Sequence, residues 1–190
     1  MHGQSPRMLR AAPQASPRST VLVTGSELVR GGRRDANGPF LAEELTRLGL
    51  EPTRITVVGD EASELEEAIR EALKADLLVI SGGLGPPHDD RTVELLARAA
   101  GLEALVDPEL EREIEAVSRR IAEAFNRPYA EFEPGVRKQA TVPAGGRVIG
   151  IAGTAPGLVV QTDGAVAVVL PGPPPELRRL WQAALGDEAV

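Results

Sequence analysis

Residues 81–92, SGGLGPPHDDRT, are the part of this chain best suited to chemistry. They follow a short apolar run and precede a segment with helical periodicity. Gly82, Gly83 and Gly85 let the backbone approach a ligand closely, so that several N–H groups can converge on one anion. The start of the following helix adds a partial positive charge. The segment therefore predicts a site for a phosphate group.

Two adjacent carboxylates, Asp89 and Asp90, lie where that helix is expected to begin. A helix start keeps a carboxylate ionised, and an ionised carboxylate beside a phosphate attracts a divalent cation such as Mg²⁺. Asp35 closes another loop and is expected to approach the same place. The alternative for each of these acids is helix capping, because aspartate commonly accepts the free N–H groups of a first turn.

A second glycine-rich loop follows the first predicted strand, residues 20–24. In open parallel sheets ligands bind beyond the carboxyl ends of the strands, so both loops are expected at one ligand site. Neither loop has the lysine of a P-loop or the spacing of a dinucleotide fingerprint, and a proline-stiffened turn is the alternative for residues 81–92. Besides the residues named above, the predicted ligand site contains Gly25, Ser26, Glu27, Ser81, Leu84, Thr92, Lys138, Thr154, Gly157, Pro171 and Gly172.

The composition narrows the class of protein. The 190 residues suit one domain, and 42% hydrophobic with 26% charged residues is typical of a globular protein. A net charge of −7 argues against a nucleic-acid surface, and the lack of cysteine excludes disulfides. No apolar run reaches the length of a membrane span, and residues 1–19 lack the apolar core of a secretory signal. We predict a cytoplasmic location, no membrane or nucleic-acid partner, and a disordered tail over residues 1–19.

Short apolar segments at 20–24, 54–58 and 77–80 alternate with segments of helical periodicity. This alternation predicts an α/β fold with a mostly parallel sheet and helices on both of its faces. Residues 157–170 predict a β-hairpin near the C-terminus, and a last helix follows it. Residues 126–143 show no period and are predicted to form a loop. We expect one domain over residues 20–186.

Taken in order, the segments GSEL, DAN, SGGLGP with DD, RKQA, GTAPG and PGPPPE resemble a known family. It is the molybdopterin-binding domain of molybdenum-cofactor biosynthesis proteins of the MogA and MoaB type, and the likeness is strongest to the amino-terminal domain of the CinA proteins. The resemblance spans about residues 20–182. It implies a three-layer α/β/α sandwich. It also matches Asp90 to a loop aspartate of metal and phosphate chemistry and Asp35 to the acidic residue of a DTN-like motif, and we predict both as catalytic and metal-binding residues.

Three functions remain open at this stage. The first is a pyrophosphatase that uses Mg²⁺ or another divalent cation to hydrolyse a nucleotide such as ADP-ribose, as the CinA resemblance implies. The second is molybdopterin binding or adenylylation in molybdenum-cofactor biosynthesis. The third is a non-catalytic nucleotide-binding module that works with a separately encoded deamidase partner. The resemblance also implies a homo-oligomer, either a dimer or a trimer.

Overall fold

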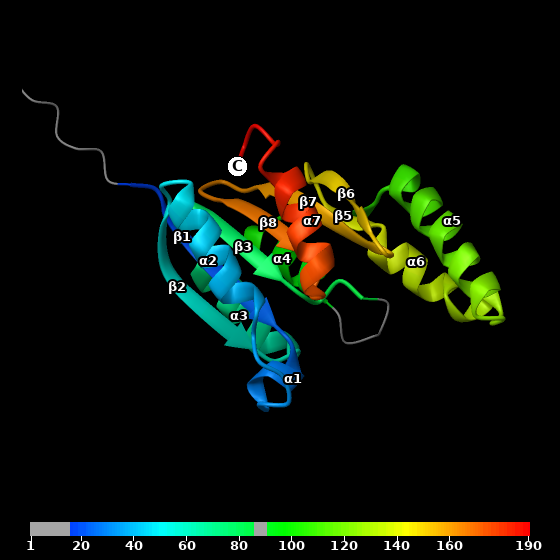
Figure 1. Cartoon of the computed structure of the whole chain (residues 1–190). Coiled ribbons are helices and arrows are strands. Elements are labelled where there is room, and N and C mark those ends of the chain that lie inside the picture. Colours follow the sequence, from blue (N-terminus) through cyan, green and yellow to red (C-terminus); the bar gives the residue numbers. More distant parts are fainter. Residues whose placement is uncertain (1–15, 86–90) are drawn as a thin grey trace, which may run out of the picture.

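The computed structural model describes residues 16–85 and 91–190 (Figure 1). Along the chain the elements are β1 (Arg18–Thr24), α1 (Ser26–Val29), α2 (Asn37–Arg47), β2 (Glu51–Val58), α3 (Ala62–Ala72), β3 (Leu77–Ser81), α4 (Thr92–Ala100), β4 (Ala104–Val106), α5 (Pro108–Ala124), the 3₁₀ turn η1 (Tyr129–Glu131), α6 (Glu133–Gln139), β5 (Thr141–Pro143), β6 (Arg147–Ala152), β7 (Ala155–Gln161), β8 (Val166–Leu170) and α7 (Pro174–Ala184).

Six strands form the main sheet in the order β2-β1-β3-β8-β7-β6. The first four are parallel, whereas β7 runs antiparallel to both β8 and β6. Strands β7 and β8 are the predicted hairpin, and its turn closes with the Thr162 N–H donating to the Ala165 carbonyl at 2.9 Å. The mostly parallel sheet and the hairpin are therefore confirmed. Strands β4 and β5 pair separately.

Alternating side chains of the central strands supply two separate cores. Val21, Val23 and Val79 pack on one face with apolar residues of α2 and α7. Leu22 and Leu78 pack on the other face with residues of α3, α4, α5 and α6. This division follows from the two-residue period of a strand, which sends neighbouring side chains to opposite faces. Helices thus cover both faces of the sheet (Figure 1), and the three-layer sandwich is confirmed.

The prediction of a loop over residues 126–143 is wrong. This stretch contains η1, α6 and β5. Helix α6 has only seven residues, so its buried side chains Val136 and Gln139 are too few to produce a recognisable period. The helix matters for function because it carries Gln139 to the end of the sheet where the glycine-rich loops lie.

The start of the sheet and the character of the helices bear on two further predictions, the tail and the lack of a membrane span. Strand β1 begins at Arg18, inside the stretch expected to form a tail, and residues 1–15 lie outside the described part of the chain. No helix within residues 16–85 and 91–190 has the length and apolar character needed to cross a membrane.

Candidate functional site

The carboxyl ends of β1, β3 and β8 meet at one edge of the sheet, as parallel strands must. Two adjoining cavities open there, of about 460 Å³ and 600 Å³. They share Thr24, Glu27, Gly172 and Pro173 in their walls. We call them together the loop cleft. Its position is the one predicted from the strand order.

The turn after β3 is fixed in a shape that requires glycine at two positions. Gly82 and Gly83 have φ of +107° and +69°. A Cβ on Gly82 would lie 2.5 Å from the Thr24 carbonyl oxygen, and one on Gly83 would lie 1.8 Å from the Thr92 hydroxyl oxygen. The Gly82 N–H donates to the Leu170 carbonyl at 2.9 Å. The turn is therefore locked between β1, β8 and the start of α4.

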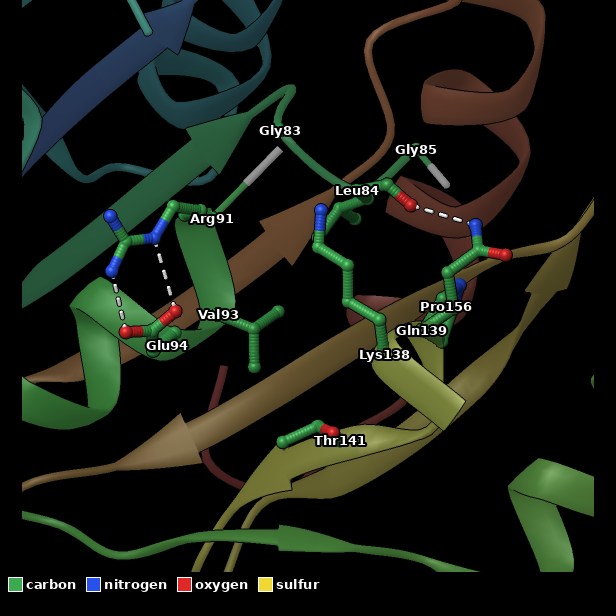
Figure 2. A pocket seen from close by; sticks show the side chains of 10 residues that line it. All are labelled: Gly83, Leu84, Gly85, Arg91, Val93, Glu94, Lys138, Gln139, Thr141 and Pro156. Carbon is green, nitrogen blue, oxygen red and sulfur yellow. Dashed lines mark hydrogen bonds and ion pairs between the residues drawn. The ribbon is translucent and has the colours of Figure 1, made fainter. Parts of the chain in front are cut away.

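Gln139 joins two of the loops that line the cleft (Figure 2). Its Nε2 donates to the Leu84 carbonyl at 2.8 Å, as Figure 2 shows. The same atom also donates to the Thr154 hydroxyl at 3.1 Å. The side chain is buried, so both bonds are shielded from water. The RKQA motif contained Gln139, and Lys138 beside it was predicted as a site residue, but Gln139 itself was not predicted, because its partners Leu84 and Thr154 are distant in the chain.

Asn37 plays the corresponding part on the other side of the cleft. Its Nδ2 donates to the Ser81 hydroxyl at 2.9 Å and to the Gly172 carbonyl at 2.7 Å. One buried amide thus ties the loops after β3 and β8 to the start of α2. The sequence motif DAN contained this residue, but its amide could be assigned a role only once the three loops were seen together.

Asp35 caps α2, as the alternative interpretation held. Its Oδ1 accepts the Asn37 N–H at 2.8 Å and the Gly38 N–H at 3.0 Å. A Cβ on Gly38 would lie 2.3 Å from Asp35 Oδ2, so glycine is needed for the carboxylate to sit there. Asp35 also lines the larger cavity. Capping holds the carboxylate in one position, and this is compatible with a role towards a ligand.

Asp60 also lines the loop cleft, although it is not among the site residues predicted from the sequence. Its Oδ2 accepts the Ser26 N–H at 2.9 Å and its Oδ1 accepts the Thr24 hydroxyl at 3.2 Å. Burial raises the pKa of the Asp60 carboxyl, but the hydrogen bonds from Ser26 and Thr24 outweigh it and lower the pKa overall. Asp60 directly follows Gly59 at the end of β2, and that position at the common sheet edge was the signal that could have identified it.

The family is settled by comparison with known proteins. Residues 20–188 match the family described as "Probable molybdopterin binding domain". The chain is also 44% identical over 180 residues to a CinA-like protein of Mycobacterium leprae and 42% identical over 183 residues to one of Mycobacterium tuberculosis. The chain belongs to the CinA-like molybdopterin-binding domain family.

These CinA-like relatives are longer than the present chain. The alignments cover 92% of the chain but only 41% and 42% of the two relatives, so the chain spans about two fifths of their length. The CinA protein of Thermoplasma acidophilum, of unknown function, has the same fold, with a TM-score of 0.78, 32% identity, and coverage of 92% of this chain and 99% of that one. MoaB of Pyrococcus furiosus shares the fold alone, with a TM-score of 0.56, 22% identity, and coverage of 92% and 93%.

Most residues that the family motifs predicted for the ligand site lie at the loop cleft. Its walls contain Gly25, Glu27, Asp35, Ser81, Gly82, Gly83, Leu84, Gly85, Thr154, Pro171 and Gly172. Ser26 lies behind this wall, where its hydroxyl accepts the Asp60 N–H at 3.2 Å. Gly157 lies inside β7 instead, where a Cβ would be 2.9 Å from Ile149.

A smaller cavity of about 130 Å³ lies next to the glycine turn (Figure 2). Lys138 lines it, together with Arg91 and Glu94. Arg91 and Glu94 form a two-point ion pair, with Nη2–Oε1 at 2.7 Å and Nε–Oε2 at 3.1 Å. The hydrogen bond from Arg91 lowers the pKa of the Glu94 carboxyl, so this acid is charged and already paired. Lys138 therefore lines this cavity beside the glycine turn and does not line the loop cleft.

Asp89 and Asp90 lie outside the described residues. Within residues 16–85 and 91–190, no three His, Asp or Glu side chains gather closely enough to hold a metal ion. Asp35 and Asp60 each have oxygen lone pairs left after their hydrogen bonds, and they line adjoining cavities. Mg²⁺ usually binds through one or two carboxylates together with substrate phosphates. The described residues fit a cation held in that way, but not a site made of protein ligands alone.

Proposed function

We propose that this CinA-like domain binds a pyrophosphate-bearing nucleotide, such as ADP-ribose, in the loop cleft and hydrolyses it with a divalent cation. The observation that carries the proposal is the Thr92 hydroxyl. It is fully buried behind Gly83 at the start of α4, and it has no hydrogen-bond partner in the described part of the chain. A buried hydroxyl without a partner is costly. Thr92 lines neither cavity of the loop cleft, so a phosphate oxygen would reach its hydroxyl only with a small shift of the glycine turn, and that shift is part of the proposal.

The surroundings of this hydroxyl suit a phosphate group. The glycine turn has no side chains at positions 82, 83 and 85 that would hold a ligand away from the backbone. Helix α4 starts at Thr92 and contributes the positive end of its dipole. Gln139 and Asn37 fix the turn from both sides, so its N–H groups need little rearrangement when a ligand binds.

The residues of the cleft would bind the phosphate group and position a cation beside it. The turn and Thr92 bind and orient a phosphate group, and Asp35, Asp60 and Asp90 carry negative charge around it. A divalent cation, when bound between these acids and the phosphates, would offset charge and make a water molecule more acidic. The cation and the role of Asp90 are parts of the proposal.

The test is a hydrolysis assay with purified protein. ADP-ribose, FAD, NAD and ATP are offered with Mg²⁺, Mn²⁺ or Co²⁺, and release of AMP is measured by chromatography. We expect cation-dependent AMP release that Asp90→Asn reduces at least a hundredfold, about the size of losing one transition-state contact. Asp163→Asn, in the exposed turn between β7 and β8, is the matched control and should retain activity. Equal activity in Asp90→Asn would refute the catalytic role of Asp90.

A second candidate function is molybdopterin binding or adenylylation, and the match to a molybdopterin-binding domain favours it. It uses the same cleft. Pterin fluorescence that copurifies with the protein, together with no hydrolysis of any nucleotide, would favour it. Tight nucleotide binding with neither activity would instead favour the non-catalytic module with a separate deamidase partner.

A further inference from the structure

The loop cleft contains a carboxylate, that of Glu176, with no hydrogen-bond or ion-pair partner among the described residues. Glu176 lies in the first turn of α7 and lines the smaller of the two cleft cavities, with the glycine turn and Thr154. No hydrogen bond or ion pair within residues 16–85 and 91–190 reaches its side chain. The side chain is half-buried, so it is also only partly solvated.

The usual role of a glutamate at this position is not available. Glu176 is the third helical residue, from which a glutamate side chain normally reaches back to the N–H of the residue before the helix. Here that residue is Pro173, which has no N–H, and Pro174 and Pro175 follow it. The first N–H groups of the helix are those of Glu176 and Leu177. Both already donate to the Pro173 carbonyl, at 3.1 Å and 3.0 Å. The helix start therefore leaves the carboxylate unused.

The neighbouring loop makes room for this carboxylate. Gly153, in the GTAPG segment, has φ of +61°, and a Cβ there would lie 3.2 Å from Glu176 Oε1. Burial raises the pKa of the Glu176 carboxyl, and the nearby Arg179 opposes this only in part. The Arg179 guanidinium donates to the Ile151 carbonyl at 3.0 Å. Perturbed carboxyl groups in cavities are common at binding sites, and here the cavity and the space left by Gly153 accompany the raised pKa.

We propose that Glu176 recognises a pair of adjacent hydrogen-bond donors on the ligand, either the ribose diol of a nucleotide or the amide and amino edge of a pterin. The two oxygens of a carboxylate can accept from two neighbouring donors at once. This inference rests on the proposed function, because it assigns the Glu176 contact to a ligand that occupies the same cleft. It extends that function by naming the chemical group that selects the ligand.

The experiment compares two ligand pairs by isothermal titration calorimetry on the full chain. ADP is compared with 2′,3′-dideoxy-ADP, which lacks the diol, and pterin is compared with lumazine, which replaces the amino group with a carbonyl. We expect the wild-type protein to prefer the parent compound in one pair by about tenfold to a hundredfold, as hydrogen bonds to a charged group give. Glu176→Gln should lose that preference, and so should Glu176→Asp, because its shorter side chain withdraws the carboxylate. If the preference that depends on Glu176 is found with ADP, the donors are those of a ribose diol; if it is found with pterin, they are those of a pterin edge.

Two controls separate recognition from structure. Glu109→Gln changes an acid in the first turn of α5 and should leave every affinity unchanged. Thermal unfolding of Glu176→Gln at pH 7 should show a melting temperature equal to or above that of the wild type, because an ionised, unpaired acid has been removed. A lower melting temperature with an unchanged ligand preference would overturn the proposal and make Glu176 structural.

The same proteins are assayed for hydrolysis, so that the two proposals can fail separately. Normal hydrolysis with unchanged preference in Glu176→Gln would overturn only the role of Glu176. No hydrolysis, with a preference that Glu176→Gln abolishes, would overturn only the pyrophosphatase. No binding of any of the four compounds by the wild type, together with no hydrolysis of any nucleotide, would overturn both.

Discussion

The contact between Gly83 and Thr92 gives the sharpest structural prediction, because the chain contains a matched control for it. A Cβ on Gly83 would lie 1.8 Å from Thr92 Oγ1 and 2.9 Å from Thr92 Cβ. Gly101 has almost the same φ, +68° against +69°, but no atom lies within 4 Å of the position where its Cβ would be. Alanine at Gly101 therefore tests backbone strain alone, and alanine at Gly83 tests strain and collision together.

Backbone strain and the collision with Thr92 each lower the free energy of unfolding by an amount that can be estimated. A left-handed conformation costs a residue with a Cβ about 1–2 kcal/mol, and this is the loss of unfolding free energy expected for Gly101→Ala. Overpacking adds about 1–3 kcal/mol, so Gly83→Ala should lose about 2–5 kcal/mol. The difference between the two variants, read from urea unfolding curves followed by circular dichroism, measures the collision with Thr92.

A double variant identifies the atoms involved. Thr92→Ala removes Oγ1, so it should recover part of the stability lost in Gly83→Ala, while the contact with the remaining Cβ persists. Equal losses in Gly83→Ala and Gly101→Ala would refute the close packing of the glycine turn on α4. Purely additive losses in the double variant would point to a collision elsewhere.

Three further predictions concern the residues around the cleft and one surface pair. Gln139→Met should lower the free energy of unfolding by about 1–3 kcal/mol in urea, because the Leu84 carbonyl and Thr154 hydroxyl lose their buried donor; no loss would show that the two loops do not depend on this amide. Asp60→Asn should lose a similar amount, because the charged acceptor of the Ser26 N–H is removed; unchanged unfolding would rule out Asp60 as the anchor of the first loop. The hydrogen bond from Arg147 lowers the pKa of Asp187 to about 2 from its ordinary 3.8. Since the pKa is lower in the folded state, the pair stabilises the fold fully above about pH 4, and its contribution disappears as the pH falls through about 2. Thermal melts of wild type and Arg147→Met should therefore differ at pH 6 and converge as the pH falls below 2, and a difference as large at pH 2 as at pH 6 would contradict this assignment.

The sequence predicted the layout of this protein because its strands are short, apolar and separated by periodic helices. Leu22 and Leu78 face one layer of helices and Val21 and Val79 face the other, as the strand period requires. From that pattern the common edge of the parallel strands followed, and so did the meeting of the glycine-rich loops.

The polar ties between the loops could not be predicted in the same way. Asn37 donates to Ser81 and Gly172, which lie 44 and 135 residues away in the chain. No local spacing encodes such a contact. Gln139 was missed for the same reason, since its partners Leu84 and Thr154 lie 55 and 15 residues away. The lack of a partner for Glu176 among the described residues depends on a cavity that forms only in the fold.

The most direct test of the central proposal is a titration of ¹⁵N-labelled protein with ADP-ribose, followed through its backbone amide resonances. If the glycine turn holds the phosphates, the amide signals of Gly83, Gly85 and Thr92 should shift most, because the Gly82 N–H is already bonded to the Leu170 carbonyl. Gly83→Ala should abolish the shifts at Gly85 and Thr92, whereas Gly101→Ala should not. Saturable binding with shifts confined to other parts of the chain, or the same shifts in Gly83→Ala, would contradict a phosphate site at this turn.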